Sequence, residues 1–455
     1  MRGSRRIHHK PYYPPTLKEK ALLPYICRLA PGETGFALEW LDNACTGSHT
    51  LFYGLRGEEA KTALPLTGAT AEVTGLLPDT DYEFYIEAET GAKSNLRLVR
   101  TGAIPEGAVV INYLHPEDTQ YDFSGQYLCS PSLARTKSGR LVAGMDVFAG
   151  KAAQNLTLLF KSEDNGKTWR YLTDLFPFYW ASLFTKDDVL YIFGLTTEYG
   201  SLQIACSHDE GETWSEPSIL FHGSNVLCPY GGFHRAPMQV THHKGRLYTS
   251  CEYGSWGHGS HLPSVLSIDE HDDPMVPENW SLADFLPFEG AWKEAAGCKQ
   301  FDTIEGNVVP GPDGNLYNYM RWTLGSFLRL KVNEADPESP LEFAGIVPAP
   351  VSNSMFKVIY TGEKYLLLTN RKTEASGKFD CWTQRSVLSL FESEDMEHFT
   401  LLTDVVNREN EDPHEVGFQY PAYLYENGEL LVVVRSGFNR AHNNHDANYS
   451  LFFHL

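Results

Sequence analysis

The sequence of 455 residues lacks an apolar run of about 18 residues, the length that a transmembrane helix needs, and no apolar segment follows the basic residues at its start. The first absence argues against a membrane-spanning helix and the second against a secretory signal peptide. None of the eight cysteines forms a Cys-x-x-Cys pair, and such scattered thiols are typical of a reducing cytoplasm. We therefore expect a cytoplasmic protein with no membrane partner.

Basic residues are also few relative to acidic ones. Lysine and arginine total 37 against 58 aspartates and glutamates, which gives a formal net charge of −21. This charge argues against binding to nucleic acids or to an anionic membrane, but it does not exclude an arginine cluster that holds an anionic ligand. Hydrophobic residues make up 42% and aromatic residues 13% of the chain, enough to fill a large β domain with a smaller domain beside it.

Two eight-residue segments, Ser162–Trp169 and Ser207–Trp214, share the pattern Ser-x-Asp-x-Gly-x-Thr-Trp and begin about 45 residues apart. Aspartate and glycine suit a tight turn between two outer strands, the hydroxyls can bond the turn backbone, and the tryptophan can pack beneath it. The pattern resembles the Asp-box (BNR) repeat of the sialidase-like β-propellers. A degenerate third copy begins at Ser393.

An apolar strand, a turn and a second apolar strand recur six times after residue 108. The copies are Ser130 to Phe148, Trp180 to Thr197, His234 to Tyr253, Glu305 to Trp322, Met355 to Arg371, and Gln419 to Phe438. The last copy is followed by one further strand, and Val109 to Tyr113 could supply the missing one and so close the ring. We therefore predict an all-β fold with a six-bladed β-propeller at 108–455, with seven blades left open.

A separate unit precedes the predicted propeller. Residues 76–82 read Leu-Leu-Pro-Asp-Thr-Asp-Tyr, which resembles the tyrosine corner of fibronectin type III domains, where the Tyr hydroxyl bonds the backbone. Trp40 would be the core tryptophan of such a domain. We predict an N-terminal arm at 1–19, a fibronectin type III-like β-sandwich at 20–103 and a short linker before the propeller.

Polar and aromatic residues mark the channel mouth of the predicted propeller, where first strands begin and second strands end. Such a ring is typical of a polar ligand site with stacking platforms, and several arginines suit a carboxylate. The residues at these positions include Ser130, Trp180, His234, Arg235, Glu305, Asn307, Lys357, Gln419 and Tyr420 at the starts, and Asp146, Tyr199, Glu252, Tyr253, Arg321, Arg371 and Arg435 at the ends.

Two groups of propellers resemble this arrangement. Sialidases use three arginines on the sugar carboxylate, a Tyr nucleophile paired with Glu, and an Asp acid/base, but their first arginine is absent from Cys129–Leu133 here. The propeller also resembles bacterial sialidase-like proteins that include uronate-directed lyases and rhamnosyl-glucuronate-cleaving enzymes. The matching stretches are Gly231–Pro237, Glu305–Val309, Phe418–Tyr420 and His442–Tyr449. In that group a His often precedes the first-blade Asp, whereas here Met145 precedes Asp146.

The first hypothesis is a lyase or glycosidase that cleaves a terminal linkage of a uronic-acid-containing oligosaccharide or polysaccharide. His234 would be the acid/base, because its pKa suits proton transfer near neutral pH, and Glu305 would be the second acid/base or would orient Arg321. The alternatives are a non-catalytic glycan-binding propeller, an exo-sialidase and a structural scaffold. The remaining assigned residues are Tyr253, with Tyr199 as the alternative, as catalytic partner of His234, and Arg235, Arg321, Arg435, Tyr199, Trp180, Asn307 and Tyr420 as substrate-binding residues.

The run His442-x-x-His445-Asp446 is the one candidate metal site. Two histidines and an aspartate are ligands for zinc or calcium, but residues three apart on a strand point to opposite faces, so a shared ion needs a turn there. Hydrogen bonds that brace the channel are the alternative. We expect no obligatory cofactor; a structural divalent metal is the one cofactor that the pattern suggests.

Overall fold

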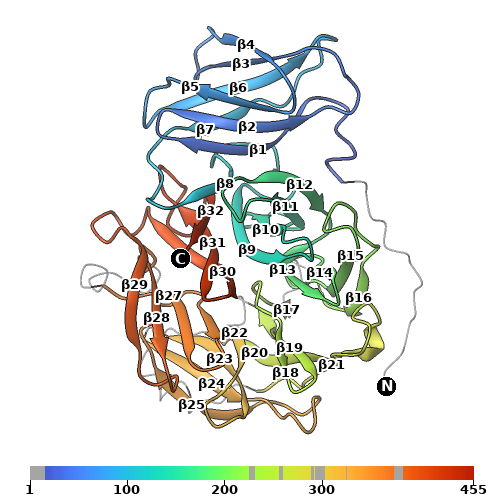
Figure 1. Cartoon of the computed structure of the whole chain (residues 1–455), viewed down its shortest axis with the longest axis vertical. Coiled ribbons are helices and arrows are strands. Elements are labelled where there is room, and N and C mark those ends of the chain that lie inside the picture. Colours follow the sequence, from blue (N-terminus) through green and yellow to red (C-terminus); the bar gives the residue numbers. More distant parts are fainter. Residues whose placement is uncertain are drawn as a thin grey trace.

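The computed structural model describes residues 16–224, 231–255, 260–287, 292, 303–323, 325–373 and 383–455. Their regular structure is almost entirely strand, arranged as a small sandwich of two sheets beside a ring of six sheets (Figure 1). No helix among these residues is long and apolar enough to cross a membrane. The all-β prediction is therefore confirmed.

The sandwich consists of a sheet in the order β1-β2-β5 and a sheet in the order β4-β3-β6-β7. In β6 every second residue is buried, as expected for a strand with one face in the core. The Tyr82 hydroxyl accepts a hydrogen bond of 2.9 Å from the Leu77 backbone N–H, the contact predicted for a tyrosine corner. The strands are β1 (Tyr25–Gly32), β2 (Gly35–Leu41), β3 (His49–Leu55), β4 (Thr62–Leu66), β5 (Thr70–Thr74), β6 (Asp81–Ala88) and β7 (Arg97–Arg100).

The first three blades of the ring follow one another along the chain. The third is irregular, because two short strands take the place of one innermost strand and both pair with β19. The strands are β9 (Tyr127–Arg135), β10 (Leu141–Phe148), β11 (Leu156–Ser162) and β12 (Arg170–Leu175); β13 (Tyr179–Lys186), β14 (Val189–Leu195), β15 (Leu202–Ser207) and β16 (Ser218–Phe221); then β17 (Gly232–His234), β18 (Thr241–His243), β19 (Arg246–Ser255), β20 (Ser260–Asp269) and β21 (Ser281–Leu282), with a 3-10 turn at Pro277–Asn279.

The other three blades complete the ring, and the last one joins the two ends of the propeller. Its fourth strand, β8 (Val109–Tyr113), pairs with β32 antiparallel, with Tyr449 opposite Tyr113. The predicted closure and six blades are therefore confirmed, and a seventh blade is not present among the described residues. The strands are β22 (Ile304–Pro310), β23 (Leu316–Thr323), β24 (Ser326–Lys331) and β25 (Glu342–Pro348); β26 (Lys357–Tyr360), β27 (Tyr365–Asn370), β28 (Val387–Ser393) and β29 (Thr400–Asn407); then β30 (Gly417–Glu426), β31 (Glu429–Gly437) and β32 (Tyr449–His454).

The repeated Ser-x-Asp-x-Gly-x-Thr-Trp segments form the turns between third and fourth strands. Asp164 accepts bonds from the Thr168 N–H at 2.8 Å and from the Thr168 hydroxyl at 2.6 Å. Asp209 makes the same two bonds to Thr213 at the same distances. In the degenerate copy, Asp395 accepts from the His398 N–H instead. Each aspartate therefore holds its own turn, as the pattern predicted.

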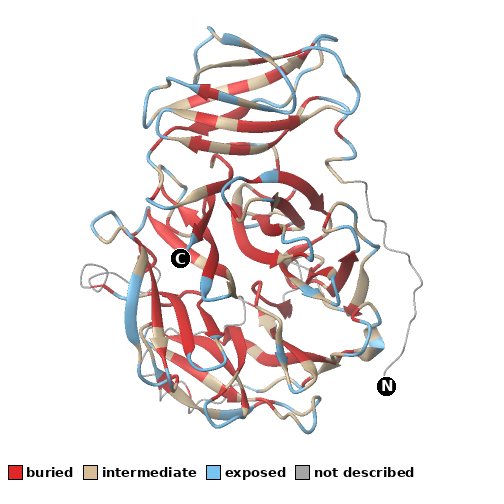
Figure 2. Cartoon of the chain, viewed as in Figure 1, coloured by how far each residue is buried: buried red, intermediate tan, exposed pale blue. Residues whose placement is uncertain are grey.

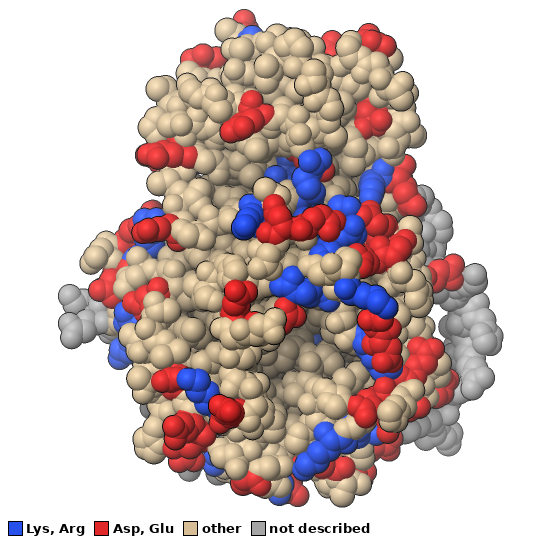
Figure 3. Space-filling view, viewed as in Figure 1, with Lys and Arg blue, Asp and Glu red and all other residues tan. Residues whose placement is uncertain are grey.

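The core of each blade lies between neighbouring sheets. Figure 2 shows that the middles of the ring strands are buried and that exposed residues collect in the turns and outer strands. The sandwich packs on the ring through polar contacts as well: Arg28 donates to the carbonyls of Ile111 and Val110 at 2.7 and 2.9 Å, and the Tyr171 N–H donates to Glu39 at 2.8 Å. In Figure 3, lysine and arginine are fewer on the visible face of the sandwich than on the ring below it.

Candidate functional site

Four blades present a residue to the channel from the same strained position of the innermost strand. Ser130, Trp180, Glu305 and Tyr420 have φ values of 50°, 48°, 60° and 53°. At each of them the pairing with the second strand slips, so that the first strand carries an extra residue. A β-bulge of this kind re-aims a side chain, and left-handed backbone at non-glycine residues is a strain that clusters at functional sites.

Tyr420, Glu305 and Arg321 form one hydrogen-bonded network across the channel. The Tyr420 hydroxyl donates to Glu305 Oε1 at 2.6 Å, and Arg321 Nη1 donates to Glu305 Oε2 at 2.9 Å and to the Tyr420 oxygen at 3.1 Å. Arg321 Nε also donates to Asn353 at 2.8 Å. Glu305 and Arg321 are both 2% exposed, so the pair is shielded from water and its geometry is fixed.

Two more arginines flank the Tyr420 ring. The guanidinium carbon of Arg435 lies 5.1 Å from the ring centroid, and that of Arg385 lies 5.9 Å from it. Arg385 was missed in the sequence analysis because it lies in the turn before β28, neither at a first-strand start nor at a second-strand end. With Arg321, the structure brings three guanidinium groups together around one Tyr–Glu pair.

The network sets the protonation of its members. Burial, followed by the charge of Glu305, raises the pKa of Tyr420 to about 12. Burial alone would raise the pKa of Glu305, but the charge of Arg321 and the hydrogen bonds from Tyr420 and Arg321 outweigh it and lower that pKa below its usual value. Near neutral pH the site therefore holds a neutral phenol that donates to an ionised carboxylate.

His234 lies in an aromatic enclosure contributed by the second and third blades. Its Nδ1 is 3.2 Å from Glu252 Oε2, and its ring lies 4.4 Å from the Trp180 ring and 4.5 Å from the His261 ring, between centroids. Tyr199 stacks near His261 at 6.1 Å. Burial, with the charge of His234, lowers the pKa of His261 to about 2, so His261 is neutral. His234, Trp180 and Tyr199 are thus brought together as predicted.

Three residues predicted to belong to the ligand site make other contacts in the structure. Tyr253 does not face His234, because it follows Glu252 on the strand and points the other way, where its ring packs on Phe233 and Phe285 at 5.4 and 5.2 Å. Arg235 is fully buried, with its guanidinium 4.2 Å from the centre of the Phe193 ring. Asn307 bonds the backbone of the neighbouring blade at Phe356 and Val358. The structure therefore does not bring these three residues into the Tyr420–Glu305 network or, for Tyr253, beside His234.

The histidines of the predicted metal site are engaged with other side chains. His445 Nδ1 is 2.8 Å from Asp446 Oδ1, and His442 stacks on Tyr127 at 5.2 Å between ring centroids. Among the described residues, three candidate ligand atoms within 4.8 Å of one another occur at Asp42, Cys45 and His49, not at His442 and His445. His445 instead accepts, through its backbone carbonyl, a bond of 3.0 Å from Arg435 Nε.

Asp146 of the first blade is fully buried. It accepts a bond of 2.5 Å from the Thr157 hydroxyl, and burial raises its pKa to about 7. Lys357, at the start of β26 in the fifth blade, donates to the Pro237 carbonyl at 2.7 Å, and burial with the charge of Arg235 lowers its pKa to about 7. Both side chains are buried and bonded to neighbouring strands or loops.

Solved structures with the same architecture include two glycosidases. An α-L-arabinanase of Penicillium chrysogenum, complexed with arabinobiose, is 14% identical with a TM-score of 0.52, and the match covers 77% of this chain and 98% of the enzyme. The α-L-arabinofuranosidase Arb93A of Fusarium graminearum, in complex with an iminosugar inhibitor, is 12% identical with a TM-score of 0.51 over the same shares.

The chain has a sialidase-like β-propeller fold. A microbial sialidase, Hz136, aligns with a TM-score of 0.49 at 12% identity, over 96% of this chain and 93% of its own. No protein-family model and no curated protein matches the sequence. At these identities the likeness is one of fold, and the chemistry has to be argued from the side chains at the channel.

Proposed function

We propose that the protein is a glycoside hydrolase that releases a terminal, negatively charged sugar from an oligosaccharide. The observation that carries the proposal is the Tyr420 hydroxyl, 2.6 Å from Glu305 and surrounded by Arg321, Arg385 and Arg435. A phenol is a weak nucleophile unless a base accepts its proton, and Glu305 is placed to do so.

The proposed reaction has two steps. Glu305 takes the Tyr420 proton while the phenolic oxygen attacks the anomeric carbon, and the glycosidic C–O bond breaks as an acid protonates the leaving oxygen. Water then attacks the same carbon, the Tyr–sugar bond breaks, and the proton returns from Glu305 to Tyr420. His234, held by Glu252, is the candidate acid in the first step and the candidate base for that water. A covalent intermediate divides one difficult displacement into two easier ones.

The three arginines support an anionic substrate. Guanidinium groups bind carboxylates through paired, charge-assisted hydrogen bonds, and each such contact contributes about 1.5–3 kcal/mol. Arg435 is oriented by uncharged groups, the carbonyl and ring of His445 at 3.0 and 3.2 Å. A sugar acid such as a uronate would place its carboxylate among these groups while its ring packs on Trp180, which is partly exposed.

Elimination from a uronate is the second candidate. It is favoured by the His234–Glu252 pair, because a His oriented by a carboxylate can remove the proton next to a uronate carboxylate that an arginine neutralises. The product then carries a carbon–carbon double bond and absorbs ultraviolet light. The glycosidases of similar fold were solved with sugars or sugar mimics, which supports a carbohydrate ligand in both cases, as it would for a non-catalytic binding propeller.

We also propose that the chain divides at about residues 103–108 into a fibronectin type III-like unit and the propeller. The strand order of the sandwich and the Tyr82 bond support this division. The protein would act in the cytoplasm, on glycan fragments small enough to enter the channel, and needs no cofactor for the steps above.

The test is a trapping experiment. The protein is incubated with a panel of 2-fluoro glycosyl fluorides, both acidic and neutral, and peptides are mapped by mass spectrometry. We expect an adduct on Tyr420 with an acidic member only, none in Tyr420→Phe, and an unchanged adduct in the control Tyr425→Phe, whose tyrosine is on the same strand. Turnover of natural oligouronides with an ultraviolet-absorbing product and no adduct would establish elimination instead. Binding of the oligosaccharide without turnover or adduct would indicate a non-catalytic, glycan-binding propeller.

A further inference from the structure

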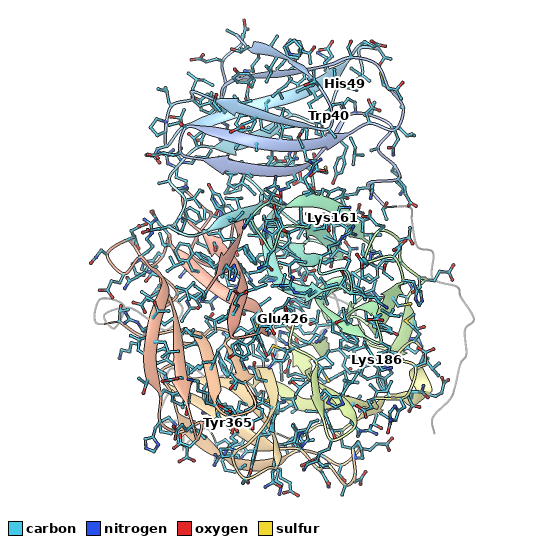
Figure 4. All side chains as sticks on the ribbon, viewed as in Figure 1. Trp40, His49, Lys161, Lys186, Tyr365 and Glu426 are labelled. Carbon is cyan, nitrogen blue, oxygen red and sulfur yellow. The ribbon has the colours of Figure 1, made fainter. Side chains whose placement is uncertain are left out.

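The loop that joins β2 to β3 of the sandwich gathers three different ligand-type side chains. Candidate ligand atoms of Asp42, Cys45 and His49 all lie within 4.8 Å of one another. The side chains of Asp42 and His49 are 1% and 4% exposed, whereas Cys45 is half-buried. The ring of Trp40 packs 4.3 Å from that of His49, between centroids, and both residues are labelled in the sandwich in Figure 4. This cluster lies outside the propeller channel.

Hydrogen bonds fix the direction of the Asp42 carboxylate. Its Oδ1 accepts from the backbone N–H groups of Ala44 at 2.8 Å and Cys45 at 3.1 Å, which leaves Oδ2 facing His49 Nε2 at 3.1 Å. The loop itself is pinned, because the Ser48 N–H donates to Glu89 at 3.0 Å. Gly47 packs against the carboxylate end of the Glu89 side chain, because a Cβ there would lie 2.0 Å from Glu89 Oε1.

Both nitrogens of the buried His49 ring face oxygen acceptors. Nδ1 is 3.0 Å from the Gly47 carbonyl and Nε2 is 3.1 Å from the Asp42 carboxylate. A neutral imidazole has one N–H and satisfies one of these acceptors, while the lone pair of its other nitrogen would face the second acceptor. A cation at Nε2, either a proton or a metal ion, removes that conflict.

We propose that Asp42, Cys45 and His49 bind a zinc ion, through Asp42 Oδ2, Cys45 Sγ and His49 Nε2, with water as the fourth ligand. Oxygen, sulfur and nitrogen donors together suit zinc, and the Gly47 carbonyl would hold the ring in the tautomer that frees Nε2, as second-shell partners of metal-bound histidines do. The thiol loses its proton on binding, so affinity rises with pH. Because binding favours the folded chain, zinc also stabilises the protein.

The experiment uses the full chain and cobalt(II) as a spectroscopic substitute for zinc. We expect one equivalent to produce a thiolate-to-cobalt band, which zinc displaces, and a zinc-dependent rise in melting temperature. Cys45→Ser should abolish the band, and Asp42→Asn, which removes a direct ligand, should weaken zinc binding at least about 10-fold, since loss of even an outer-shell partner has that effect. Cys206→Ser, a control in β15 of the propeller, should retain both properties.

Two outcomes would overturn the proposal. No band and no zinc-dependent stabilisation in the unaltered protein would mean that a proton alone holds the Asp42–His49 pair. A band that persists in folded Cys45→Ser would place the thiolate ligand elsewhere. If Cys45→Ser does not fold, the proposal is tested by the rate at which Cys45 is alkylated in the unaltered protein with and without zinc, measured by peptide mapping. Zinc should slow the alkylation of Cys45 at least about 10-fold, the size of the effect that loss of a metal contact has on affinity. An alkylation rate that zinc leaves unchanged would contradict the proposed site.

Discussion

The rim turns and the channel mouth of this propeller are built in opposite ways. At the rim, Asp164 and Asp209 make the same bonds at the same distances to residues four positions along the chain. At the mouth, Tyr420 bonds Glu305, which is 115 positions away, and the backbone at both residues is left-handed. Repetition and local bonding maintain the fold, whereas strain and long-range contacts build the site. Substitutions in the two regions should therefore separate stability from activity.

The largest expected effect is at the mouth. His234→Gln keeps a hydrogen bond to Glu252 but cannot carry a proton near neutral pH, so we expect turnover to fall roughly 100-fold or more while substrate affinity is retained. Single-turnover kinetics measures the chemical step directly, and thermal unfolding should change little. His398→Gln, in an exposed rim turn, is the control. Equal turnover in both variants would place the acid/base elsewhere.

The arginines should affect binding more than chemistry. Arg435→Gln removes a charge beside the Tyr420 ring, and we expect affinity for an acidic sugar to weaken by about 1.5–3 kcal/mol, with little change for its neutral analogue. Calorimetry with the matched pair of sugars measures the difference. Arg329→Gln, on β24 away from the channel, should behave like the unaltered protein. Equal losses for both sugars would argue against a carboxylate contact.

Asp146 tests the boundary between the two regions, because it is fully buried in the first blade but makes no proposed contact with substrate. Burial raises its folded-state pKa from 3.8 to about 7. The protonated form is therefore favoured in the folded protein, and this contribution to stability is present below pH 3.8 and is lost as pH rises through about 7. In Asp146→Asn, the melting temperature should fall less between about pH 5 and pH 8 than in the unaltered protein. An identical pH dependence in both would show that Asp146 is ionised when folded.

The smallest effect is expected at the rim. Asp164→Ala removes side-chain bonds to its own turn, and we expect the free energy of unfolding to decrease by roughly 1 kcal/mol with substrate preference unchanged. Asp209→Ala should behave in the same way, because its contacts are the same. Denaturant titration measures the loss. A large drop in activity in a fully folded Asp164→Ala protein would remove the distinction between rim and mouth.

The amino-acid sequence predicted the parts of the site that depend on strand position. Trp180, Glu305 and Tyr420 begin first strands and Arg321 and Arg435 lie near second-strand ends, and the structure brings all five to the channel region. The sequence did not distinguish Glu252 from Tyr253 as the partner of His234. Neighbouring residues on a strand point to opposite faces, but which of the two points towards His234 depends on the strand register, which only the structure gives. Arg385 had no signal of this kind, since it lies in a turn.

The sequence by itself determined the all-β fold, the six blades, the strand that closes the ring and the turns that their aspartates hold, because each of these follows from patterns repeated within a few residues or at blade spacing. Only the tertiary structure decided which polar side chains face the channel, that Arg235 and Asn307 brace the wall, and that Arg385 joins the Tyr420–Glu305 pair. Those outcomes depend on bulges that turn single side chains and on contacts between blades, such as Arg235 with Phe193, 42 positions apart, and Tyr420 with Glu305, 115 positions apart, which no local pattern specifies.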